Sequence, residues 1–281
     1  MIIGITTGDP KGVGPEIVQE ALEDPDIKSL AEFRVFGPIQ SQLKLSDREA
    51  AEIALRSLEQ GVEEAIGKRV QALVTGPVNK ARLRLVDPTF IGHTEFFANH
   101  CHAKVCPIFV ARNWRVALVT RHIPLAQVAQ QLNAIDILQT IRMTHKNLQK
   151  LFGILEPKIA VAGLNPHAGE QGLLGEEETK IIRPAIMQAA KEGIDVEGPF
   201  SPDTLFWKMT SGKWDAIVAM YHDQGLIPIK TLAFKDTVQI TLGLPFLRVS
   251  VDHGTAEDIV GTGKADSTNL KAAIRLACQL G

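Results

Sequence analysis

The chain of 281 residues is predicted to fold as an α/β protein with a mainly parallel or mixed sheet. Two observations predict this class. Short apolar runs rich in β-branched residues alternate with longer helix-like stretches from one end of the chain to the other. Gly, Pro, His and Asp cluster directly after the predicted strands, where open α/β sheets bind their ligands. The sequence therefore predicts both the fold class and the edge of the sheet at which a site would lie.

The predicted strands are apolar, β-branched runs at residues 2–6, 33–36, 72–75, 106–111, 116–120, 158–162, 216–219 and 239–241. The predicted helices cover residues 15–23, 47–66, 95–101, 125–131, 135–152, 176–192, 202–209 and 268–280. The helix at 135–152 carries apolar residues at positions 135, 138, 141, 148, 151 and 152, a spacing that indicates a face packed on the core. There is no internal repeat and no long linker, so two lobes would have to share segments that cross between them.

The composition argues against several classes of protein. With a formal net charge of −2 and a sequence pI of about 6.5, the chain lacks the basic character of a nucleic-acid-binding protein. No stretch reaches the roughly 18 apolar residues of a membrane span, and the first residues do not resemble a signal peptide. Cys101, Cys106 and Cys278 form an odd set without framework spacing, which favours a reducing cytoplasm. A small anionic substrate stays compatible, because it needs only a local cluster of cations.

Seven polar loops follow predicted strands and together describe a cleft. They are Thr7-Gly8-Asp9-Pro10, Thr75-Gly76-Pro77-Val78-Asn79-Lys80, Gly92-His93-Thr94-Glu95, Thr120-Arg121-His122, Gly163-Leu164-Asn165-Pro166-His167, Tyr221-His222-Asp223-Gln224-Gly225 and Asp252-His253-Gly254-Thr255. One such loop would be weak evidence for a site. Because the carboxyl ends of strands converge at one edge of a sheet, seven of them indicate a ligand-binding cleft.

Three of these loops carry a histidine directly after a strand, namely His122, His167 and His222. Each alone is more typical of a hydrogen-bonded loop residue. Three imidazoles together suit Zn²⁺, Co²⁺ or a similar divalent ion that keeps open positions for a substrate oxygen. The segment around Cys101 and Cys106 lacks the paired ligand spacing of a structural zinc site and is expected to be a helix end followed by a buried strand cysteine.

Two features could bind an anion. His93 and Thr94 open a predicted helix, and the free N–H groups of a helix N-terminus favour anions, although Thr94 is also an ordinary helix cap. Lys230 and Arg248 flank a predicted strand and could donate charge-assisted bonds to a phosphate or carboxylate. Each cation alone is more typical of a solvated surface position.

The remaining polar motifs are less specific. The glycine-rich stretch at residues 8–15 lies between a strand and a helix, but it matches neither the dinucleotide fingerprint nor the phosphate-binding loop of kinases. Asp203 begins a predicted helix, where a carboxylate is common for structural reasons. Asp223 and Asp252 adjoin histidines and could orient them, and Glu170 is a further possible acid.

Taken together, these motifs closely resemble the 4-hydroxythreonine-4-phosphate dehydrogenase family of vitamin B6 biosynthesis. The matching strings are Gly-Asp-Pro-x-Gly-x-Gly-Pro-Glu, Thr-Gly-Pro-Val-Asn-Lys, Gly-His-Thr-Glu-Phe, Gly-Leu-Asn-Pro-His-Ala-Gly-Glu, Pro-Asp-Thr-Leu-Phe, Met-Tyr-His-Asp-Gln-Gly and Asp-His-Gly-Thr-Ala. They occur in order over nearly the whole chain. The resemblance implies a fold like that of isocitrate and isopropylmalate dehydrogenases, with two α/β/α lobes and a cleft between them. We expect residues 1–92 with 252–281 in one lobe and residues 93–251 in the other.

The resemblance also implies the chemistry and its residues. A family member is a homodimer that uses NAD or NADP and a divalent metal, Zn, Mg, Co or Mn, and its active site is completed across the dimer interface. It oxidises 4-phosphooxy-L-threonine to a β-keto acid that loses CO2, which leaves 3-amino-2-oxopropyl phosphate. The implied residues are the metal ligands His122, His167 and His222, the substrate-binding His93, Thr94, Lys230, Gln239 and Arg248, and the catalytic Asp203 and Lys230. His253 is expected in the cleft, outside the metal shell.

Three departures from the family pattern stand out. The region between Phe36 and Glu52 is shorter than in typical members, Gln239 stands where asparagine is usual, and Arg121 stands where threonine is common. Gln239 and Arg121 could reshape the pocket. The substrate could therefore be phosphohydroxythreonine or the related 4-phospho-D-threonate or 4-phospho-D-erythronate. A phosphate-transfer enzyme on a related α/β scaffold would also explain the anion-binding loops, but it would leave the three histidines without a role.

Overall fold

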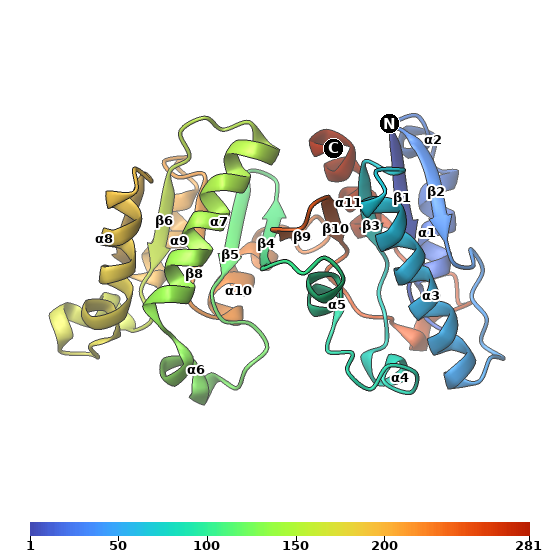
Figure 1. Ribbon diagram of the computed structural model, residues 1–281, viewed down its shortest axis with the longest axis horizontal. Helices are drawn as coiled ribbons and strands as arrows, with labels where there is room; N and C mark the ends of the chain where they lie inside the picture. Colours follow the sequence, from blue (N-terminus) through green and yellow to red (C-terminus); the bar gives the residue numbers. More distant parts are fainter. The chain divides into compact units, whose positions relative to one another are not determined.

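The computed structural model describes residues 1–281 and consists of two compact units, each an α/β fold (Figure 1). The first unit is Met1–Val105 with Lys235–Gly281, and the second is Cys106–Phe234. We expected divisions at 92/93 and 251/252, and the units divide instead after Val105 and Phe234. The reason is strand pairing, because the hairpin that precedes residue 251 pairs with a strand of the first unit. No helix is both long and apolar enough to cross a membrane.

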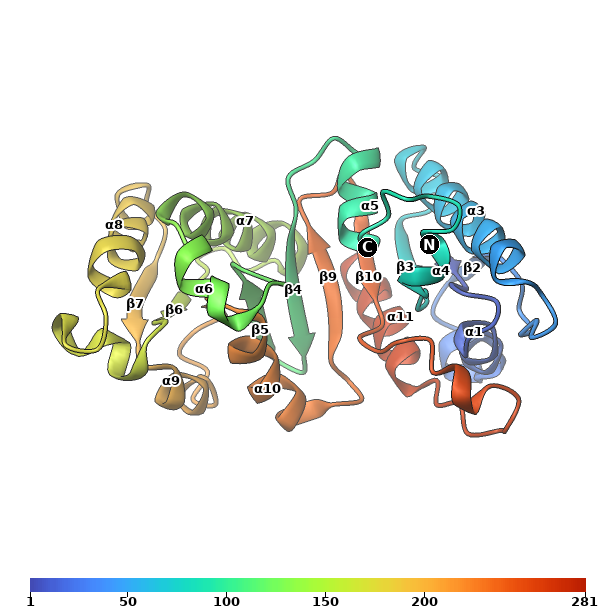
Figure 2. The ribbon, with the colours of Figure 1, turned by 90° about the horizontal axis from the view of Figure 1, so that it is seen from below.

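In the first unit the strand order is β2-β1-β3-β10-β9. The strands are β1 (Ile2–Thr6), β2 (Glu32–Phe36), β3 (Ala72–Thr75), β9 (Val238–Leu242) and β10 (Leu247–Ser250). All neighbours are parallel except β9, which runs antiparallel to β10. Its helical elements are α1 (Gly14–Glu23), α2 (Pro25–Lys28), α3 (Asp47–Ile66), α4 (Lys80–Leu83), α5 (His93–His100), η3 (Glu257–Ile259) and α11 (Thr268–Leu280). Helices α3 and α11 cover opposite faces of the sheet (Figure 2).

Local sequence explains why these elements form. Helix α3 begins with a capping box in which the Ser46 hydroxyl accepts from the Glu49 N–H and the Glu49 carboxylate accepts from the Ser46 N–H. One face of α3 is lined by small buried residues, and Gly61 lies so close to the sheet that a Cβ there would meet Thr6 Cγ2 at 2.9 Å. Strand β3 is buried along its whole length, as expected for a strand covered on both faces.

In the second unit the strand order is β4-β5-β8-β6-β7. The strands are β4 (Cys106–Ala111), β5 (Trp114–Leu118), β6 (Ile159–Ala162), β7 (Val196–Phe200) and β8 (Ala216–Ala219). Strands β4 and β5 form an antiparallel hairpin, and β5, β8, β6 and β7 are parallel. The helical elements are α6 (Leu125–Gln131), α7 (Ala134–Phe152), η1 (Pro166–Gly172), η2 (Glu178–Ile182), α8 (Arg183–Lys191), α9 (Pro202–Met209) and α10 (His222–Ala233). The carboxyl ends of β5, β8 and β6 therefore lie next to one another.

The structure contains elements that the sequence pattern did not predict. Strand β7 holds Gly198 and Pro199 and is only half-buried, so it shows no strand alternation. Helix α10 contains Gly225 and Pro228, which read as helix breakers in sequence. The helix expected at 176–192 is divided, because its first turn is the π-helical η2. Apart from such local differences, the expected alternation of strands and helices is confirmed.

Candidate active site

The predicted site residues are divided between the two units. The three histidines, Asp203 and Lys230 lie in the second unit, and His93, Thr94, Gln239 and Arg248 lie in the first. Each group is described within its own unit.

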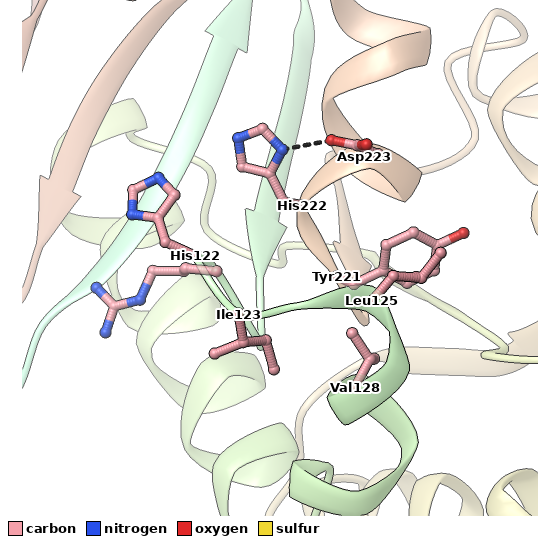
Figure 3. Close-up of a pocket in the computed structure, with 8 residues that line it drawn as sticks. His122, Ile123, Leu125, Val128, Tyr221, His222 and Asp223 are labelled. Atoms are coloured by element: carbon pink, nitrogen blue, oxygen red, sulfur yellow. Dashed lines mark hydrogen bonds and ion pairs between the residues drawn. The ribbon is translucent and has the colours of Figure 1, made fainter.

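The second unit has a pocket of about 350 Å³ at the ends of β5 and β8 (Figure 3). It is lined by Arg121, His122, Ile123, Leu125, Val128, Tyr221, His222 and Asp223. The ring centroids of His122 and His222 are 5.7 Å apart. The two histidine loops are joined through Thr120, whose N–H and hydroxyl donate to the Met220 carbonyl at 3.1 and 2.7 Å. The structure thus brings two of the three predicted metal ligands side by side.

Asp223 holds the ring of His222. Its Oδ1 lies 2.6 Å from His222 Nδ1, the contact drawn as a dashed line in Figure 3. A carboxylate can only accept, so Nδ1 carries the proton and the lone pair of Nε2 is left for another ligand. Because His222 begins α10, Asp223 also lies in the first turn, where a negative charge is favoured by the helix dipole. This pairing is the orienting role that the sequence suggested for Asp223.

His167 lies on the loop after β6, in a turn with unusual backbone geometry. Residues 167–171 all have φ between 41° and 76°, so η1 contains a left-handed turn in which only one of five residues is glycine. Non-glycine residues pay about 1–2 kcal/mol each for this conformation. The side chain of His167 is 68% exposed, and its Nδ1 lies 3.3 Å from Glu170 Oε2. The surrounding structure must therefore hold this turn in place.

Asp203, at the start of α9, is the neighbour of His167. The Ser201 hydroxyl donates to its Oδ1 and lowers the pKa of the carboxyl below its usual value, and the charge of His167 lowers the pKa further. In the structure, no three or more His, Cys, Asp or Glu side chains are gathered closely enough to hold a metal ion. Accordingly, the rings of His122 and His222 lie side by side, whereas His167 lies near Asp203.

The first unit contains a buried cation. Arg248, on β10, is 0% exposed, and burial lowers the pKa of its guanidinium to about 9, so it still carries a proton at neutral pH. It donates to Thr75 Oγ1 at 2.6 Å, to Thr241 Oγ1 at 2.9 Å and to Gln239 Oε1 at 3.3 Å. These acceptors are neutral and Arg248 Nε has no hydrogen-bond partner, while the charge of the nearby Glu95 raises the pKa of the guanidinium and offsets part of the effect of burial. The alternative of a solvated surface cation is therefore wrong for Arg248.

His93 lies beside this guanidinium. Its ring stacks on Phe97 with centroids 6.3 Å apart, and the Arg248 guanidinium lies 5.3 Å from the centroid of the same Phe97 ring. Burial holds the pKa of His93 well below its usual value, and the charges of Arg248 and Lys80 lower it further. His93 Nε2 is buried and has no hydrogen-bond partner. Two polar groups that lack partners, His93 Nε2 and Arg248 Nε, thus lie close to one aromatic ring.

The N-terminus of α5 has no side-chain cap, and the Glu95 carboxylate and the Lys80 side chain lie against Gly92. Gly92 occupies the cap position, no side chain caps the helix, and Thr94 lies within the first turn. Capping alone therefore does not explain Thr94. Lys80 was not predicted from the sequence, yet it lies near Gly92 and contributes positive charge at His93. The only sequence signal for Lys80 was its place after a strand in the string that ends Val78-Asn79-Lys80.

The glycine-rich loop after β1 is explained by packing. A Cβ on Gly8 would lie 2.1 Å from the Pro77 carbonyl oxygen, and one on Gly14 would lie 2.0 Å from the Thr7 carbonyl oxygen. The buried Asp9 of this loop accepts from the Arg82 guanidinium. The loop is therefore tightly packed against its own unit, and its glycines reflect close backbone contacts.

The other residues singled out in the sequence are placed as follows. Lys230 lies on α10 two turns after His222, with its Nζ 5.6 Å from the centroid of Phe234. Asp252 and His253 follow β10 in the first unit, and His253 Nδ1 contacts the Gly254 carbonyl oxygen at 2.9 Å. His253 thus belongs to a different unit from the three predicted ligands.

Comparison with known proteins agrees with the motifs. Residues 14–277 match the family model described as pyridoxal phosphate biosynthetic protein PdxA. The chain belongs to this family. A 4-hydroxythreonine-4-phosphate dehydrogenase from Desulforapulum autotrophicum is 41% identical over 320 aligned positions, which cover 98% of this chain and 94% of that protein. A D-threonate 4-phosphate dehydrogenase from Salmonella typhimurium is 38% identical over an alignment that covers 99% of this chain and 98% of that protein.

Solved structures confirm the fold. A crystal structure of 4-hydroxythreonine-4-phosphate dehydrogenase from Klebsiella pneumoniae superposes with a TM-score of 0.88 at 35% identity, covering 98% of both chains. An isocitrate dehydrogenase from Methylococcus capsulatus matches with a TM-score of 0.51 at 15% identity, over 98% of this chain and 83% of that one. The second match concerns the fold alone. Both the family and the isocitrate-dehydrogenase-like fold named from the motifs are confirmed.

Proposed function

We propose that this protein oxidises and decarboxylates 4-phosphooxy-L-threonine to 3-amino-2-oxopropyl phosphate and CO2 in pyridoxal phosphate biosynthesis, using NAD or NADP and a divalent metal. Membership of the family and the names of full-length relatives support this activity. Among the structural observations, one carries the proposal. Arg248 is a fully buried cation whose hydrogen-bond acceptors on Gln239, Thr241 and Thr75 are neutral, next to a neutral His93 whose Nε2 has no hydrogen-bond partner.

Such a place is suited to an anionic substrate. A buried charge is costly unless an opposite charge or hydrogen bonds compensate it. A phosphate or carboxylate would accept from Arg248 and from the uncapped N-terminus of α5, and His93 could donate from Nε2 as a neutral ring. The exposed Lys80 adds a further positive charge near Gly92. We assign the binding of the substrate phosphate to the start of α5 with His93 and Thr94.

The second unit supplies the candidate metal ligands. Imidazole nitrogens suit Zn²⁺ and Co²⁺, and the Asp223 contact leaves Nε2 of His222 available beside His122. We propose that His122, His222 and His167 hold the ion in a homodimer whose active site is completed across the interface. A bound divalent ion would withdraw electrons from the substrate hydroxyl oxygen and stabilise negative charge there as the hydride and then CO2 depart.

The chain's own groups then have distinct roles. In the oxidation, the carbon that bears the hydroxyl loses a hydride to the nicotinamide and the hydroxyl loses its proton, which gives a β-keto acid. In the decarboxylation, the bond to the carboxylate breaks, its electron pair stays on the α-carbon, and that carbon takes up a proton. We propose Asp203 as a catalytic carboxylate beside His167. The Ser201 hydroxyl and, less strongly, the charge of His167 lower the pKa of the Asp203 carboxyl below its usual value. We assign the proton transfers to the Nζ of Lys230.

A second substrate is favoured by one observation. Gln239 accepts from Arg248 Nη1, so the residue that departs from the usual asparagine touches the candidate substrate-binding cation. A longer amide at this point would alter the polar contacts next to the substrate, and the Salmonella typhimurium relative is a D-threonate 4-phosphate dehydrogenase. The same chemistry on 4-phospho-D-threonate or 4-phospho-D-erythronate is therefore the second candidate.

A substrate panel tests the proposal. The metal-stripped protein is supplied with Zn²⁺, Mn²⁺, Co²⁺ or Mg²⁺, with NAD or NADP, and with each of the three phosphorylated acids, and reduced cofactor and CO2 are measured. We expect turnover that requires added metal and is fastest with 4-phosphooxy-L-threonine. A tenfold or greater preference for phosphothreonate would overturn the vitamin B6 role and keep the chemistry. Failure to reduce the cofactor with any substrate, combined with acyl transfer to phosphate, would replace the whole proposal by the phosphate-transfer alternative.

The dimeric site can be tested separately. The inactive His167→Ala and His222→Ala proteins are mixed, unfolded together and refolded, so that mixed dimers form. If one protomer's histidine completes its partner's site, the mixture regains part of the activity, because some sites then hold only unaltered residues. Sedimentation measures the dimer itself. Recovery of no activity by a mixture that sediments as a dimer would place all three ligands in a single chain.

A further inference from the structure

We propose that Glu178 and Gln224 are positioning residues that hold the His167 loop at a set place relative to His222. Both side chains are buried, at 1% and 8% exposure, and both contact the start of the loop between β6 and η1. Neither had been singled out by the sequence motifs for a role. The inference rests on the proposed function, since it concerns the presentation of two proposed metal ligands.

Glu178 binds the loop through its N–H groups. Its Oε1 accepts from the N–H of Leu164 at 2.8 Å and from that of Asn165 at 2.7 Å, and its Oε2 accepts from Asn165 Nδ2 at 3.0 Å. No ion pair of the structure includes Glu178, so these donors balance the charge of the buried carboxylate. The segment from which His167 departs is therefore fastened to η2.

The same carboxylate faces the left-handed turn. A Cβ on Gly169 would lie 2.5 Å from Glu178 Oε2, and one on Gly163 would lie 3.1 Å from Oε1. The backbone at the beginning and the middle of the loop thus fits around one side chain. Glu178 is the first residue of the π-helical turn η2. Such irregular turns often occur at functional sites. The Glu178 carboxylate therefore lies against Gly169, in the middle of the turn that has the positive φ angles.

Gln224 connects this loop to the one that carries His222. Its Nε2 donates to the Gly163 carbonyl oxygen at 2.7 Å, and its Oε1 accepts from the Met220 N–H at 2.6 Å. Met220 lies two residues before His222 and also accepts from Thr120, two residues before His122. A continuous set of hydrogen bonds, buried between the last two loops and partly buried at Thr120, therefore runs from the His122 loop through the His222 loop to the His167 loop.

The first test replaces Glu178 by glutamine. The amide keeps the shape but turns an NH2 group toward N–H donors, so the loop loses part of its support. Loss of an outer hydrogen-bond partner weakens metal binding by about 10–100-fold, and we expect this range for Zn²⁺ measured against a competing chelator. The matched control is Glu176→Gln, because Glu176 is exposed and pairs only with Lys180, and it should bind Zn²⁺ as the unaltered protein does.

Hydrogen exchange supplies a readout that needs no metal. In the metal-free Glu178→Gln protein, the amides of Leu164 and Asn165 should exchange at least tenfold faster, while strands β5 and β8 keep their protection. Saturating Zn²⁺ should restore most of kcat, because the ligands themselves are unaltered, and a protein that had merely lost its fold would not recover. Unchanged affinity together with unchanged exchange at residues 163–171 would overturn the role of Glu178.

The second test is Gln224→Glu, with Gln60→Glu on the exposed face of α3 as the control for added charge. Glutamate keeps the acceptor for the Met220 N–H but loses the donor to the Gly163 carbonyl. Exchange should therefore rise in residues 163–171 and stay slow at Met220, and the absorption spectrum of bound Co²⁺ should shift as the His167 ligand moves. A Co²⁺ spectrum and exchange rates equal to those of the control would overturn the role of Gln224.

A third variant keeps the proposal testable if Glu178→Gln fails to fold. Gly169→Ala keeps the Glu178 side chain but adds a methyl group that would collide with its carboxylate. Zn²⁺ affinity should therefore fall as in Glu178→Gln. Unaltered affinity would contradict the inference. The parent proposal is tested independently by His167→Ala. If His167→Ala binds Zn²⁺ normally, the proposed function fails. If His167→Ala loses Zn²⁺ but Glu178→Gln, Gln224→Glu and Gly169→Ala do not, the positioning role alone fails.

Discussion

The anion-binding region of the first unit and the histidine loops of the second are built in opposite ways. Arg248 is completely buried and held by three side chains, and His93 is kept neutral beside it. His167, by contrast, is largely exposed on a strained turn, and only two of the three histidines lie together. The first region forms as the sheet forms, because its cation is part of β10. The second depends on loops, one of which has several non-glycine residues with positive φ angles.

This difference predicts different consequences of mutation. Substitutions among the exposed histidines should affect metal binding and turnover with little cost to the fold. Substitutions among the buried groups should affect binding and stability together.

Replacing His222 by alanine should remove most of the bound metal and nearly all turnover, because it removes a ligand whose ring is already held by Asp223. Metal content and kcat are measured on the purified protein, and circular dichroism checks the fold. His253→Ala is the control and should keep its metal, because His253 is not one of the three proposed ligands. Full metal occupancy in His222→Ala would refute the assignment of the ligands.

Replacing Arg248 by lysine should lower kcat/KM for the phosphorylated substrate by about 10–100-fold. The charge stays, but the planar fork that donates to Thr75, Thr241 and the substrate is lost, and hydrogen bonds to charged groups contribute about 1.5–3 kcal/mol each. Unphosphorylated 4-hydroxythreonine serves as the control substrate, and the variant should discriminate less between the two. An unaltered preference for the phosphorylated substrate would show that the buried cation has another purpose.

Stability should depend on pH through His93. Its pKa in the folded protein is depressed, so the unfolded chain binds a proton that the folded chain does not. The free energy of unfolding should therefore decrease as the pH falls below about 6.5, by at most about 1.4 kcal/mol per pH unit. Urea unfolding at about pH 5.5 and about pH 7.5 measures this. The dependence should be smaller in His93→Asn and unaltered in the exposed-site control His102→Asn; equal slopes in both variants would contradict the assignment.

Replacing Gln239 by asparagine should have the smallest effect, a change of a few-fold in the ratio of kcat/KM for 4-phosphooxy-L-threonine and 4-phospho-D-threonate. The shorter amide can no longer accept from Arg248 in the same place, so the guanidinium is free to shift toward or away from the substrate. Metal binding should not change. A constant ratio would mean that Gln239 supports Arg248 without influencing the choice of substrate.

The same comparison shows what the sequence could reveal. The alternation of strands and helices predicted the fold, and the rule that ligand loops follow strands brought His122 and His222 together. Helix α10 was missed because Gly225 and Pro228 look like breakers, although neighbouring elements pack around them. The burial of Arg248 was also invisible, because a single arginine in a short apolar run looks the same whether hydroxyls surround it or water does.

Glu178 illustrates the deeper limit. In sequence it is one of three consecutive glutamates, and nothing distinguishes it from the exposed Glu176. Its selection depends on a π-helical turn that rotates one of the three toward the backbone of a distant loop. Such a contact exists only once the chain has folded, and no spacing rule predicts it.

The packing of the glycine-rich loop has a consequence for how mutational tolerance is interpreted. If every residue of the chain were varied in turn, Gly8 and Gly14 would be as intolerant as the histidines, because any side chain would collide with the carbonyl of Pro77 or Thr7. The two kinds of intolerance differ in their response to temperature. We expect a steric defect at Gly14 to be partly relieved at low growth temperature, whereas the loss of a metal ligand should persist at every temperature. A survey that ranked positions by intolerance alone would therefore not separate positions constrained by packing from positions constrained by ligand binding.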